Sequence, residues 1–300
     1  MHMEITSKRH PFKFYLNLVL WIVICSSFSF TFFKVGLEKL DKAIIGGILS
    51  VGLMFYVIFC YLKNAPKIIL NKEGIIFRNT FHIWEDLESA KLTGKKRLAI
   101  SSEECATLTF KNSSTIIIFD DFYSNISEMK LFIQNIVIDK KDEINISKQQ
   151  INLSNVEFES FNKYKGYPLF STHGFVIWLP LLYLLGASLY QLKLYPFKTL
   201  IACLIVSLFL MLVFSWMLNY FEISKNFIKV KNHYYFWKKD IYRFTEIKEI
   251  IFEERYGKRP KSLQIITHDF KTNRYYAGSL SDKTWLKLKT EMESKNIIIR

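Results

Sequence analysis

Four long stretches of the sequence contain no Asp, Glu, Lys or Arg. They comprise 20 residues between Lys13 and Lys34, 20 between Lys42 and Lys63, 27 between Lys165 and Lys193, and 23 between Lys198 and Glu222. A helix of about 20 residues spans the roughly 30 Å hydrocarbon core of a bilayer and satisfies its own backbone hydrogen bonds there. The pattern therefore predicts four transmembrane helices rather than buried helices of a soluble protein.

After each pair of apolar stretches the pattern changes to short alternating segments, which are typical of strands. The first alternating segments, "IILNKEGIIFRN" from Ile68 and "FEISKNFIKVKN" from Phe221, start 153 residues apart. The strands expected in the first copy are Lys67–Leu70, Ile75–Arg78, Leu87–Leu92, Ala106–Lys111 and Thr115–Phe119. Those expected in the second copy are Ile223, Ile228–Lys231, Tyr234–Trp237, Ile247–Phe252, Leu263–Thr267 and Tyr275–Ala277.

A helix is expected to close each copy. In the first copy, Asn125 and Glu128 have the spacing of a capping box. In the second, the helix is expected to begin near Ser281 or Asp282. Each helix has apolar residues at i, i+3 and i+7, which predicts one buried face. These residues are Met129, Phe132 and Ile136 in the first copy and Trp285, Leu288 and Met292 in the second.

This arrangement resembles bacterial membrane proteins with pleckstrin-homology-like (PH-like) domains. The likeness rests on the turns "NKEGI" and "SKNFI", the segments "WEDLESAKL" and "FTEIKEIIF", and the two closing helices. The resemblance implies a membrane α-helical protein with four transmembrane helices plus α+β domains. Each of the two small antiparallel β domains would be closed by a C-terminal helix. Two unrelated small β domains are the alternative interpretation.

The expected domain organisation follows the order of these segments. Residues 139–165 are polar with few large apolar side chains, which indicates an exposed linker. The expected boundaries are 1–13 for a cytoplasmic N-terminal segment, 14–62 for a first transmembrane hairpin, 63–138 for a PH-like domain, 139–165 for the linker, 166–220 for a second hairpin and 221–300 for a second PH-like domain.

Composition and charge agree with a membrane protein whose polar parts are cytoplasmic. Half of the residues are hydrophobic, and the mean hydropathy is +0.11 although 23% of the residues are charged. Lys and Arg are retained on the cytoplasmic side of membranes, and they cluster around the polar ends of the stretches. We therefore expect a multi-pass protein of the bacterial inner membrane with both termini in the cytoplasm. The polar domains contain only one of the four cysteines, Cys105, so no disulfide pair is expected in them.

The sequence offers no motif for catalysis, a metal or a cofactor. Its acidic pairs, such as Asp120 with Asp121 and Glu253 with Glu254, are adjacent, and neighbouring residues on a strand point to opposite faces. The six histidines lack the spacing of a metal site, and no glycine-rich phosphate loop is present. The four stretches contain no Asp, Glu, Lys or Arg that would couple transport to ions, and for His173 in the third stretch an interfacial polar contact is favoured over a titrating group within the membrane. We therefore expect a protein that is not an enzyme, has no cofactor and binds no metal.

Basic residues are the clearest chemical feature of the second domain. Residues 220–300 carry 18 Lys and Arg against 10 Asp and Glu, a net charge of +8. Anionic lipids attract each such cation by about 1 kcal/mol near a membrane surface. A merely positive flank is an equally good interpretation, whereas nucleic-acid binding is disfavoured beside a membrane. The candidate lipid-facing residues are Lys225, Lys229, Lys231, Lys238, Lys239 and Arg243.

The preferred functional hypothesis is recognition of a partner protein without catalysis. The linker and an edge strand near Ile228–Lys231 are the expected contact regions, because loops and sheet edges commonly carry binding. Immunity or self-recognition toward a delivered effector is one setting, and a lipid-sensing or accessory subunit of a transport or envelope complex is the alternative. A small-residue face on the second stretch allows homo-oligomers. The candidate partner-binding residues are Lys148, Gln149, Gln150, Asn152, Asn155, Glu157, Lys229 and Lys231.

Overall fold

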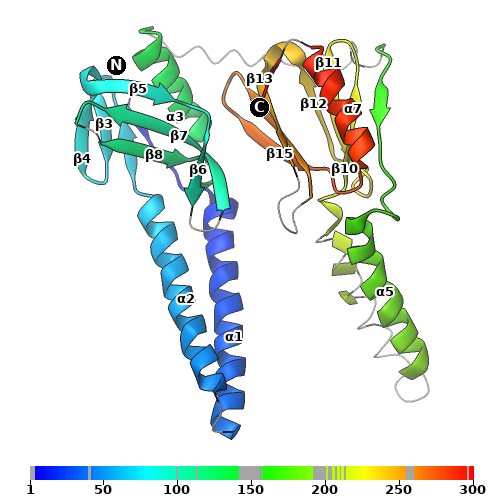
Figure 1. The fold of residues 1–300 in the computed structure, drawn as a ribbon. Helices are drawn as coiled ribbons and strands as arrows, with labels where there is room; N and C mark the ends of the chain where they lie inside the picture. Colours follow the sequence, from blue (N-terminus) through cyan, green and yellow to red (C-terminus); the bar gives the residue numbers. More distant parts are fainter. Residues whose placement is uncertain are drawn as a thin grey trace. The chain divides into compact units, whose positions relative to one another are not determined.

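The computed structural model divides the chain into two compact units, Met1–Ile146 and Ser147–Arg300 (Figure 1). Each unit is described by itself, and the structure describes the following residues: 4–39, 42–98, 101–112, 114–141, 156, 158–191, 201, 205–206, 208–209, 211–212, 214–254, 260–295 and 297–300.

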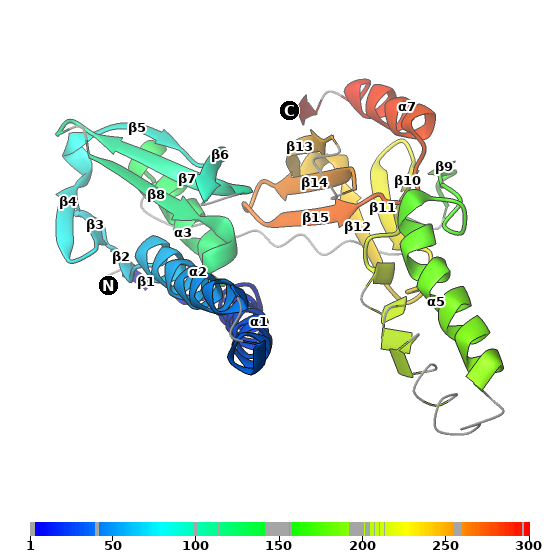
Figure 2. The same cartoon turned by 60° about the horizontal axis from the view of Figure 1, so that its bottom comes forward.

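Two helices of the first unit are long and apolar enough to cross a membrane. They are Pro11–Glu38, which comprises the π-helix η1 (Pro11–Leu16) and most of α1 (Asn17–Lys39), and α2 (Ala43–Asn64). Only 11% and 6% of their most apolar windows is buried, unlike the core helix of a soluble protein. The first two predicted spans are therefore observed as helices of the right length and composition, and they lie side by side in both ribbon views (Figure 2).

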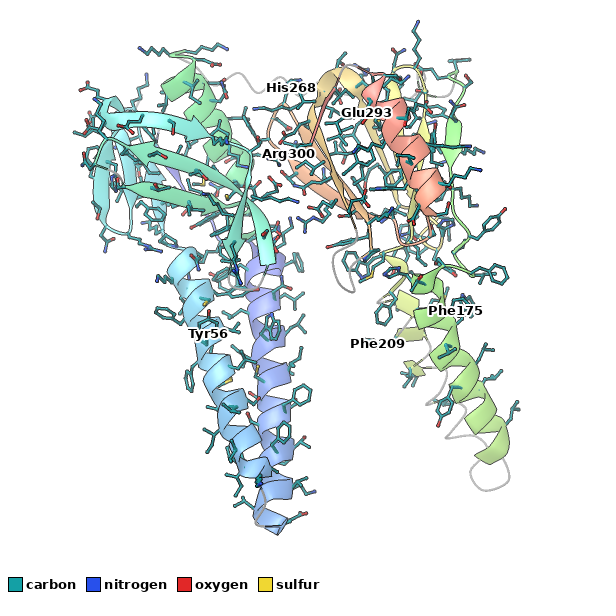
Figure 3. The ribbon with its side chains drawn as sticks, viewed as in Figure 1. Tyr56, Phe175, Phe209, His268, Glu293 and Arg300 are labelled. Carbon is teal, nitrogen blue, oxygen red and sulfur yellow. The ribbon has the colours of Figure 1, made fainter. Side chains whose placement is uncertain are left out.

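The third predicted span forms α5 (Thr172–Gln191), a helix of 20 residues without a charged side chain. It is not one of the two candidate spans found within the described residues. The fourth predicted span lies largely outside the described residues. Its described positions from 201 to 215 are helical, and Phe209 is exposed, as is Phe175 on α5 (Figure 3).

The small residues of the second stretch pack α2 against α1. A Cβ added to Gly47 would lie 2.9 Å from the Phe33 ring, and the Ser50 hydroxyl donates to the Cys25 carbonyl at 2.9 Å. Small residues let two helices approach closely in lipid. The face expected to allow self-association thus makes a contact within one chain, and association of copies stays a prediction.

The polar part of the first unit consists of two four-stranded sheets and a closing helix. The first sheet has the order β1-β2-β3-β4, and in the second β7 pairs with β5, β6 and β8. The strands are β1 (Ile5–Thr6), β2 (Ile68–Leu70), β3 (Gly74–Phe77), β4 (Thr80–Ile83), β5 (Leu87–Lys91), β6 (Lys95–Leu98), β7 (Ser101–Phe110) and β8 (Thr115–Phe119). The helical elements are η2 (Trp84–Asp86), η3 (Asp120–Phe122), α3 (Ile126–Phe132) and η4 (Ile133–Ile138).

With two differences, the second unit repeats this order: β16 follows its closing helix, and none of its described strands corresponds to β6. Its sheets have the orders β12-β11-β10-β9 and β15-β14-β13-β16. The strands are β9 (Asn162–Tyr164), β10 (Asn219–Ile223), β11 (Phe227–Asn232), β12 (Lys239–Arg243), β13 (Ile247–Glu253), β14 (Ser262–Thr267), β15 (Thr272–Tyr276) and β16 (Ile298–Ile299). The helical elements described after β10 are η5 (Phe244–Glu246) and α7 (Asp282–Glu293).

The strand register follows the spacing seen in the sequence. Leu70 pairs with Ile75, and 153 residues later Ile223 pairs with Ile228. A short 3-10 turn, η2 or η5, then leads into the second sheet, and the first strand of that sheet shows a register shift in both units. The described residues thus form an α+β protein with small, mainly antiparallel sheets, arranged similarly in the two units. The exception is β16, which pairs with β13 in parallel.

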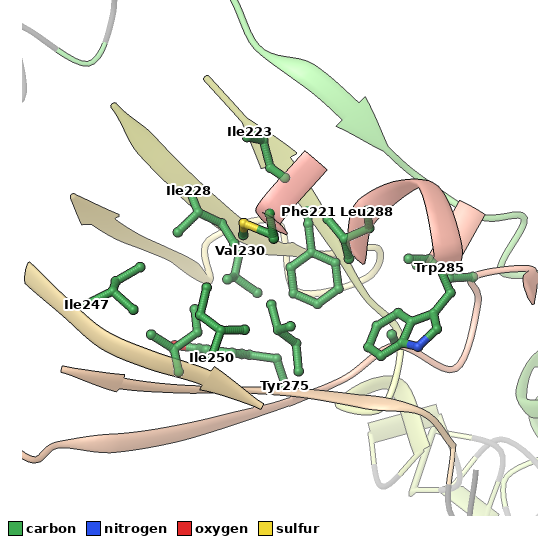
Figure 4. Close-up of a cluster of buried hydrophobic side chains, with 14 residues drawn as sticks. Phe221, Ile223, Ile228, Val230, Ile247, Ile250, Tyr275, Trp285 and Leu288 are labelled. Carbon is green, nitrogen blue, oxygen red and sulfur yellow. The ribbon is translucent and has the colours of Figure 1, made fainter. Parts of the chain in front are cut away.

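The core of the second unit lies between its sheets and α7. Phe221 and Val230 from the first sheet and Ile250 from the second are buried (Figure 4). Trp285 and Leu288 of α7 cover this cluster, as the spacing on the predicted helix requires. The Ser281 side chain accepts a hydrogen bond from the Thr284 backbone N–H at 3.2 Å and caps α7 where the sequence predicted its start.

The capping box predicted for the first closing helix does not form. Asn125 does occupy the cap position, but its side chain accepts from the Lys8 backbone N–H at 2.8 Å and donates to the Thr6 carbonyl at 2.9 Å. A contact with the chain around β1 thus replaces the local one. The buried face is as predicted at Met129 and Phe132, whereas Ile136 is half-buried.

The predicted linker is wrong at its C-terminal end. Residues Asn162–Tyr164 form β9 and pair with β10, and Val156 is buried. Likewise β1 in the N-terminal segment pairs with β2. In each unit, a short strand that precedes the apolar helices in the sequence thus pairs with the first strand that follows them. Strands this short cannot be identified from local pattern, because the pairing partner lies more than 50 residues away in both units.

The predicted strand Tyr234–Trp237 is wrong, because these residues form an exposed loop between β11 and β12. The Asn232 side-chain oxygen accepts the backbone N–H groups of Tyr234 and Tyr235 at 2.9 and 3.0 Å. Such turns formed by an Asn side chain compete with strand pairing. Phe236 and Trp237 are consequently 86% and 69% exposed.

Candidate functional site

The adjacent acidic residues bind different partners instead of facing one substrate. Asp120 forms a buried ion pair with Lys130 at 2.7 Å, whereas Asp121 forms an exposed pair with Lys13 at 2.7 Å. Glu253 accepts a hydrogen bond from Ser262 at 2.5 Å. Carboxylates that are separated and engaged in this way do not form a general acid and base pair. Lys130 was missed by sequence reasoning, since a lysine within a short helix gives no sign of burial.

A chain of hydrogen bonds joins the two sheets of the second unit. No sequence motif predicted it. Asn273 donates to the Tyr242 hydroxyl at 2.9 Å, the two hydroxyls of Tyr242 and Tyr275 lie 2.5 Å apart, and Tyr275 donates to Asp240 at 3.0 Å. Burial raises the pKa of Tyr242 to about 12 and also raises the pKa of Tyr275. Both hydroxyls are therefore protonated at neutral pH and link the sheets.

Among the described residues, no group of three or more His, Cys, Asp or Glu side chains could hold a metal ion. The predicted linker residues Lys148, Gln149, Gln150, Asn152, Asn155 and Glu157 lie outside the described residues.

The predicted edge strand near Ile228–Lys231 is an internal strand. β11 lies between β10 and β12, so its backbone is paired on both sides. Lys229 is only 8% exposed, and its ammonium lies 3.3 Å from the centre of the Phe161 ring. Lys231 is half-buried and pairs with Glu222 at 2.8 Å. Lys229 therefore belongs to the interior of the unit rather than to a surface that meets lipid or a partner.

The remaining basic candidates are divided between two ends of one sheet. β10 leads away from the fourth apolar segment, so the turn that contains Lys225 lies at the far end of the sheet. Arg243 pairs opposite Phe227 at that same end. Lys238 and Lys239 lie at the near end, one strand length or about 13–17 Å away. The six candidates thus do not form one lipid-facing patch.

The near end of this sheet carries exposed aromatic residues beside the ends of the apolar segments. The Tyr235 hydroxyl donates to the Leu212 carbonyl at 2.5 Å, and the Asn232 amide donates to the Ser215 carbonyl at 2.9 Å. Tyr167 and Phe170, each 79% exposed, immediately precede α5. We call the loop 233–238 together with Tyr167 and Phe170 the aromatic rim.

A cavity of about 550 Å³ lies beside the aromatic rim. The β15–α7 connection forms one wall, and the chain leading into α5 forms the other. Lys261 is held by Glu254 at 3.3 Å and by Asp282 at 2.9 Å. Its charge is therefore already neutralised, which weakens the cavity as an anion site. The lining includes Lys165, Tyr167, Phe170, His173, Lys261 and Asp282.

His233 at the start of the loop is neutral in the folded unit. Its Nε2 atom lies 2.9 Å from the Ser279 hydroxyl. Burial, and secondly the positive charge of Lys165, lower the pKa of His233 to about 4. The histidine therefore fixes the loop to the β15–α7 connection without carrying charge at neutral pH.

Comparisons with known proteins do not identify a family. No family model matches the chain, and no curated protein matches its sequence. The functional argument therefore depends on the residues and contacts described above.

Proposed function

We propose that the chain is a non-enzymatic integral protein of the bacterial inner membrane that recognises a partner protein. In this proposal four spans hold two PH-like units at the cytoplasmic face, with both termini inside. The helices α1 and α2 support the first hairpin by length and composition. The 20 uncharged residues of α5 support a third span, because such a helix is about 30 Å long.

The observation that carries partner recognition is the exposed edge strand β4. It ends the sheet β1-β2-β3-β4, and its side chains Phe81 and Ile83 are each 46% exposed. An exposed apolar edge strand is suited to pairing with an extended segment of another protein. The corresponding edge of the second unit, β12, contains Lys239, Asp240 and Arg243, and charged side chains oppose such pairing.

Photo-crosslinking from the edge strand tests this proposal. A photoreactive residue at Ile83, in the membrane-expressed full chain, is expected to give a discrete protein adduct. The matched control is Arg243, which has the same register position in the second unit, opposite Phe227 as Ile83 is opposite Gly74. Ile83→Lys should abolish the adduct formed from a photoreactive residue at Phe81. Equal labelling at Ile83 and Arg243, or no protein adduct at Ile83, would contradict recognition through β4.

Immunity or self-recognition toward a delivered effector is the specific role we favour for this recognition. It is supported by architecture alone, namely the apolar helices that anchor the sheets at a membrane. Survival of sensitive cells that express the chain, when challenged by effector-producing neighbours, is the expected outcome. Unchanged killing, with the chain present at the membrane, would remove this role.

A lipid-sensing or accessory subunit is the second candidate, favoured by the aromatic rim. The lipid-sensing hypothesis predicts that Lys238→Glu with Lys239→Glu weakens the contact of unit 2 with anionic membranes. The partner-recognition hypothesis predicts that the same variant keeps an unchanged crosslinked adduct at β4. Both outcomes are measurable on the same variant.

A further inference from the structure

The loop 233–238 exposes large apolar side chains that its own unit leaves uncovered. Phe236 and Trp237 are 86% and 69% exposed, although their rings contact each other with centroids 4.8 Å apart. Large apolar side chains gathered at one exposed site commonly mark an interaction surface. What binds to these side chains follows from the position at which the loop is fixed in the unit.

Two hydrogen bonds fix the loop against the last helical turn of the fourth apolar segment. Tyr235 donates to the carbonyl of Leu212, and Asn232 donates to the carbonyl of Ser215. The chain leaves the helix at residues 216 and 217. The aromatic loop therefore lies alongside the end of that segment, at the depth where a spanning helix passes from hydrocarbon into water.

The start of α5 is held at the same place. The Gly278 backbone N–H donates to the Met217 carbonyl at 2.9 Å, and a Cβ on Gly278 would lie 3.0 Å from the His173 ring. Both apolar segments thus meet the sheet domain around Gly278. Tyr167 and Phe170 precede α5 by a few residues, so they lie near this level as well.

Exposed lysines accompany the aromatic side chains. Lys238 and Lys239 follow Trp237 directly, and Lys165 precedes Tyr167. The acidic residues of this region are engaged elsewhere, since Glu254 and Asp282 pair with Lys261 and Asp240 accepts from Tyr275. Aromatic residues beside lysines are typical of the layer of lipid headgroups, where rings partition and ammonium groups contact phosphates.

We propose that the aromatic rim inserts into the headgroup layer of the bilayer that holds α5, with Lys165, Lys238 and Lys239 contacting anionic lipid phosphates. This inference rests on the proposed spans of the second unit. It assigns unit 2 a membrane contact, in addition to its helices, that fixes the orientation of the sheet domain. The first unit lacks this loop, because its β3–β4 connection consists of Arg78 and Asn79 alone.

Quenching by brominated lipids tests the insertion in the full chain. The four native cysteines are replaced by serine, and Trp237→Cys carries an NBD fluorophore in nanodiscs. Lipids brominated near the headgroup are expected to quench this position several-fold more than His268→Cys. His268 is the matched control, an exposed residue in the β14–β15 turn at the far end of the second sheet. Equal quenching at the two positions would overturn the proposal.

A third labelled position separates this inference from the proposed spans. Leu182→Cys on α5, which is 66% exposed, should be quenched by bromines deep in the acyl chains. Quenching at 182 without quenching at 237 overturns the aromatic insertion and supports the span. Quenching at 237 alone overturns the span and supports a surface contact, and quenching at neither overturns both.

The lysines have their own readout. Quenching at 237 is expected to be stronger in nanodiscs that contain phosphatidylglycerol than in phosphatidylcholine alone. Lys238→Glu with Lys239→Glu should abolish this difference while leaving quenching at 182 unchanged. Lys225→Glu is the matched control at the far end of the sheet, and it should preserve the difference. A lipid dependence that survives the double change would overturn the role of these two lysines.

Discussion

The hairpin beside the apolar helices closes differently in the two units. In the first, Arg78 and Asn79 form a two-residue turn with φ of 51° and 66°, and Arg78 donates to the Lys63 carbonyl at the end of α2 at 2.6 Å. In the second, six residues rich in aromatic side chains occupy the equivalent place and bond to Leu212. The equivalent hairpin connection is thus a tight two-residue turn in the first unit and an exposed loop in the second.

The two units therefore present different surfaces on a similar architecture. The first unit presents an apolar edge strand, whereas the second has a charged edge and an aromatic loop. A substitution in one unit can therefore be compared with the substitution at the matched position of the other unit, and different effects of the two are expected.

The largest effect is expected from the buried ion pair of the first unit. Lys130 and Asp120 are 1% and 6% exposed, and the position equivalent to Lys130 in α7 is the exposed Leu286. Lys130→Ala leaves a buried carboxylate behind and should destabilise unit 1 by about 3–5 kcal/mol. Amide hydrogen exchange of β7 and α3 in nanodiscs measures this loss.

The neighbouring exposed pair is the control for that change. Asp121→Asn breaks the contact with Lys13 and should cost less than about 1 kcal/mol, because solvent screens both groups. Exchange rates in unit 2 should not change with either variant. An equal effect of Lys130→Ala and Asp121→Asn would contradict the buried pair.

The two aligned asparagines should respond differently to glycine. Asn79 occupies the left-handed region, which glycine adopts freely, so Asn79→Gly should be neutral or slightly stabilising. Asn232 is 3% exposed, donates to Ser215 and accepts from two backbone N–H groups, so Asn232→Gly should cost about 2–3 kcal/mol of local stability. Hydrogen exchange of β3 and β11 compares the two, and similar losses would refute the distinction.

Acidification should weaken the second unit through His233. The unfolded chain binds a proton at this residue below about pH 6.5, whereas the folded unit binds it only near pH 4. Stability is therefore fully present above pH 6.5 and falls as the pH is lowered toward 4, by about 1–2 kcal/mol after allowance for partial exposure.

A pH series of hydrogen exchange on unit 2 checks this dependence. His233→Gln should flatten the profile between pH 6.5 and 4, whereas His268→Gln should preserve it. A profile that keeps its slope in His233→Gln would assign the acid sensitivity to other groups.

A small loss of stability is expected from a change of Arg78 in the turn of the first unit. Arg78→Gln removes an exposed hydrogen bond to the carbonyl at the end of α2 and should cost about 0.5–1 kcal/mol. Protease cleavage between α2 and β2 should increase slightly. Tyr235→Phe is the matched change in unit 2, and it should affect the loop without altering cleavage in unit 1.

Much of the fold followed from local pattern. Most of the alternating strands and the two closing helices were predictable because side-chain period and burial coincide there, as at Trp285 and Leu288. The strands β4, β6 and β12 were not predicted. The candidate site was predicted less well. Lys229 and Lys238 looked equivalent in the sequence, yet one is buried and the other exposed.

Residue type and spacing over a few turns specify where the apolar helices and most of the strands occur and that their order is repeated. The folded structure was needed to show that β11 is internal, that Asn125 binds the chain around β1, and that Tyr234–Trp237 forms a loop. The physical reason is that strand neighbours, buried charges and side-chain turns are set by residues far apart in the chain, which no local pattern contains.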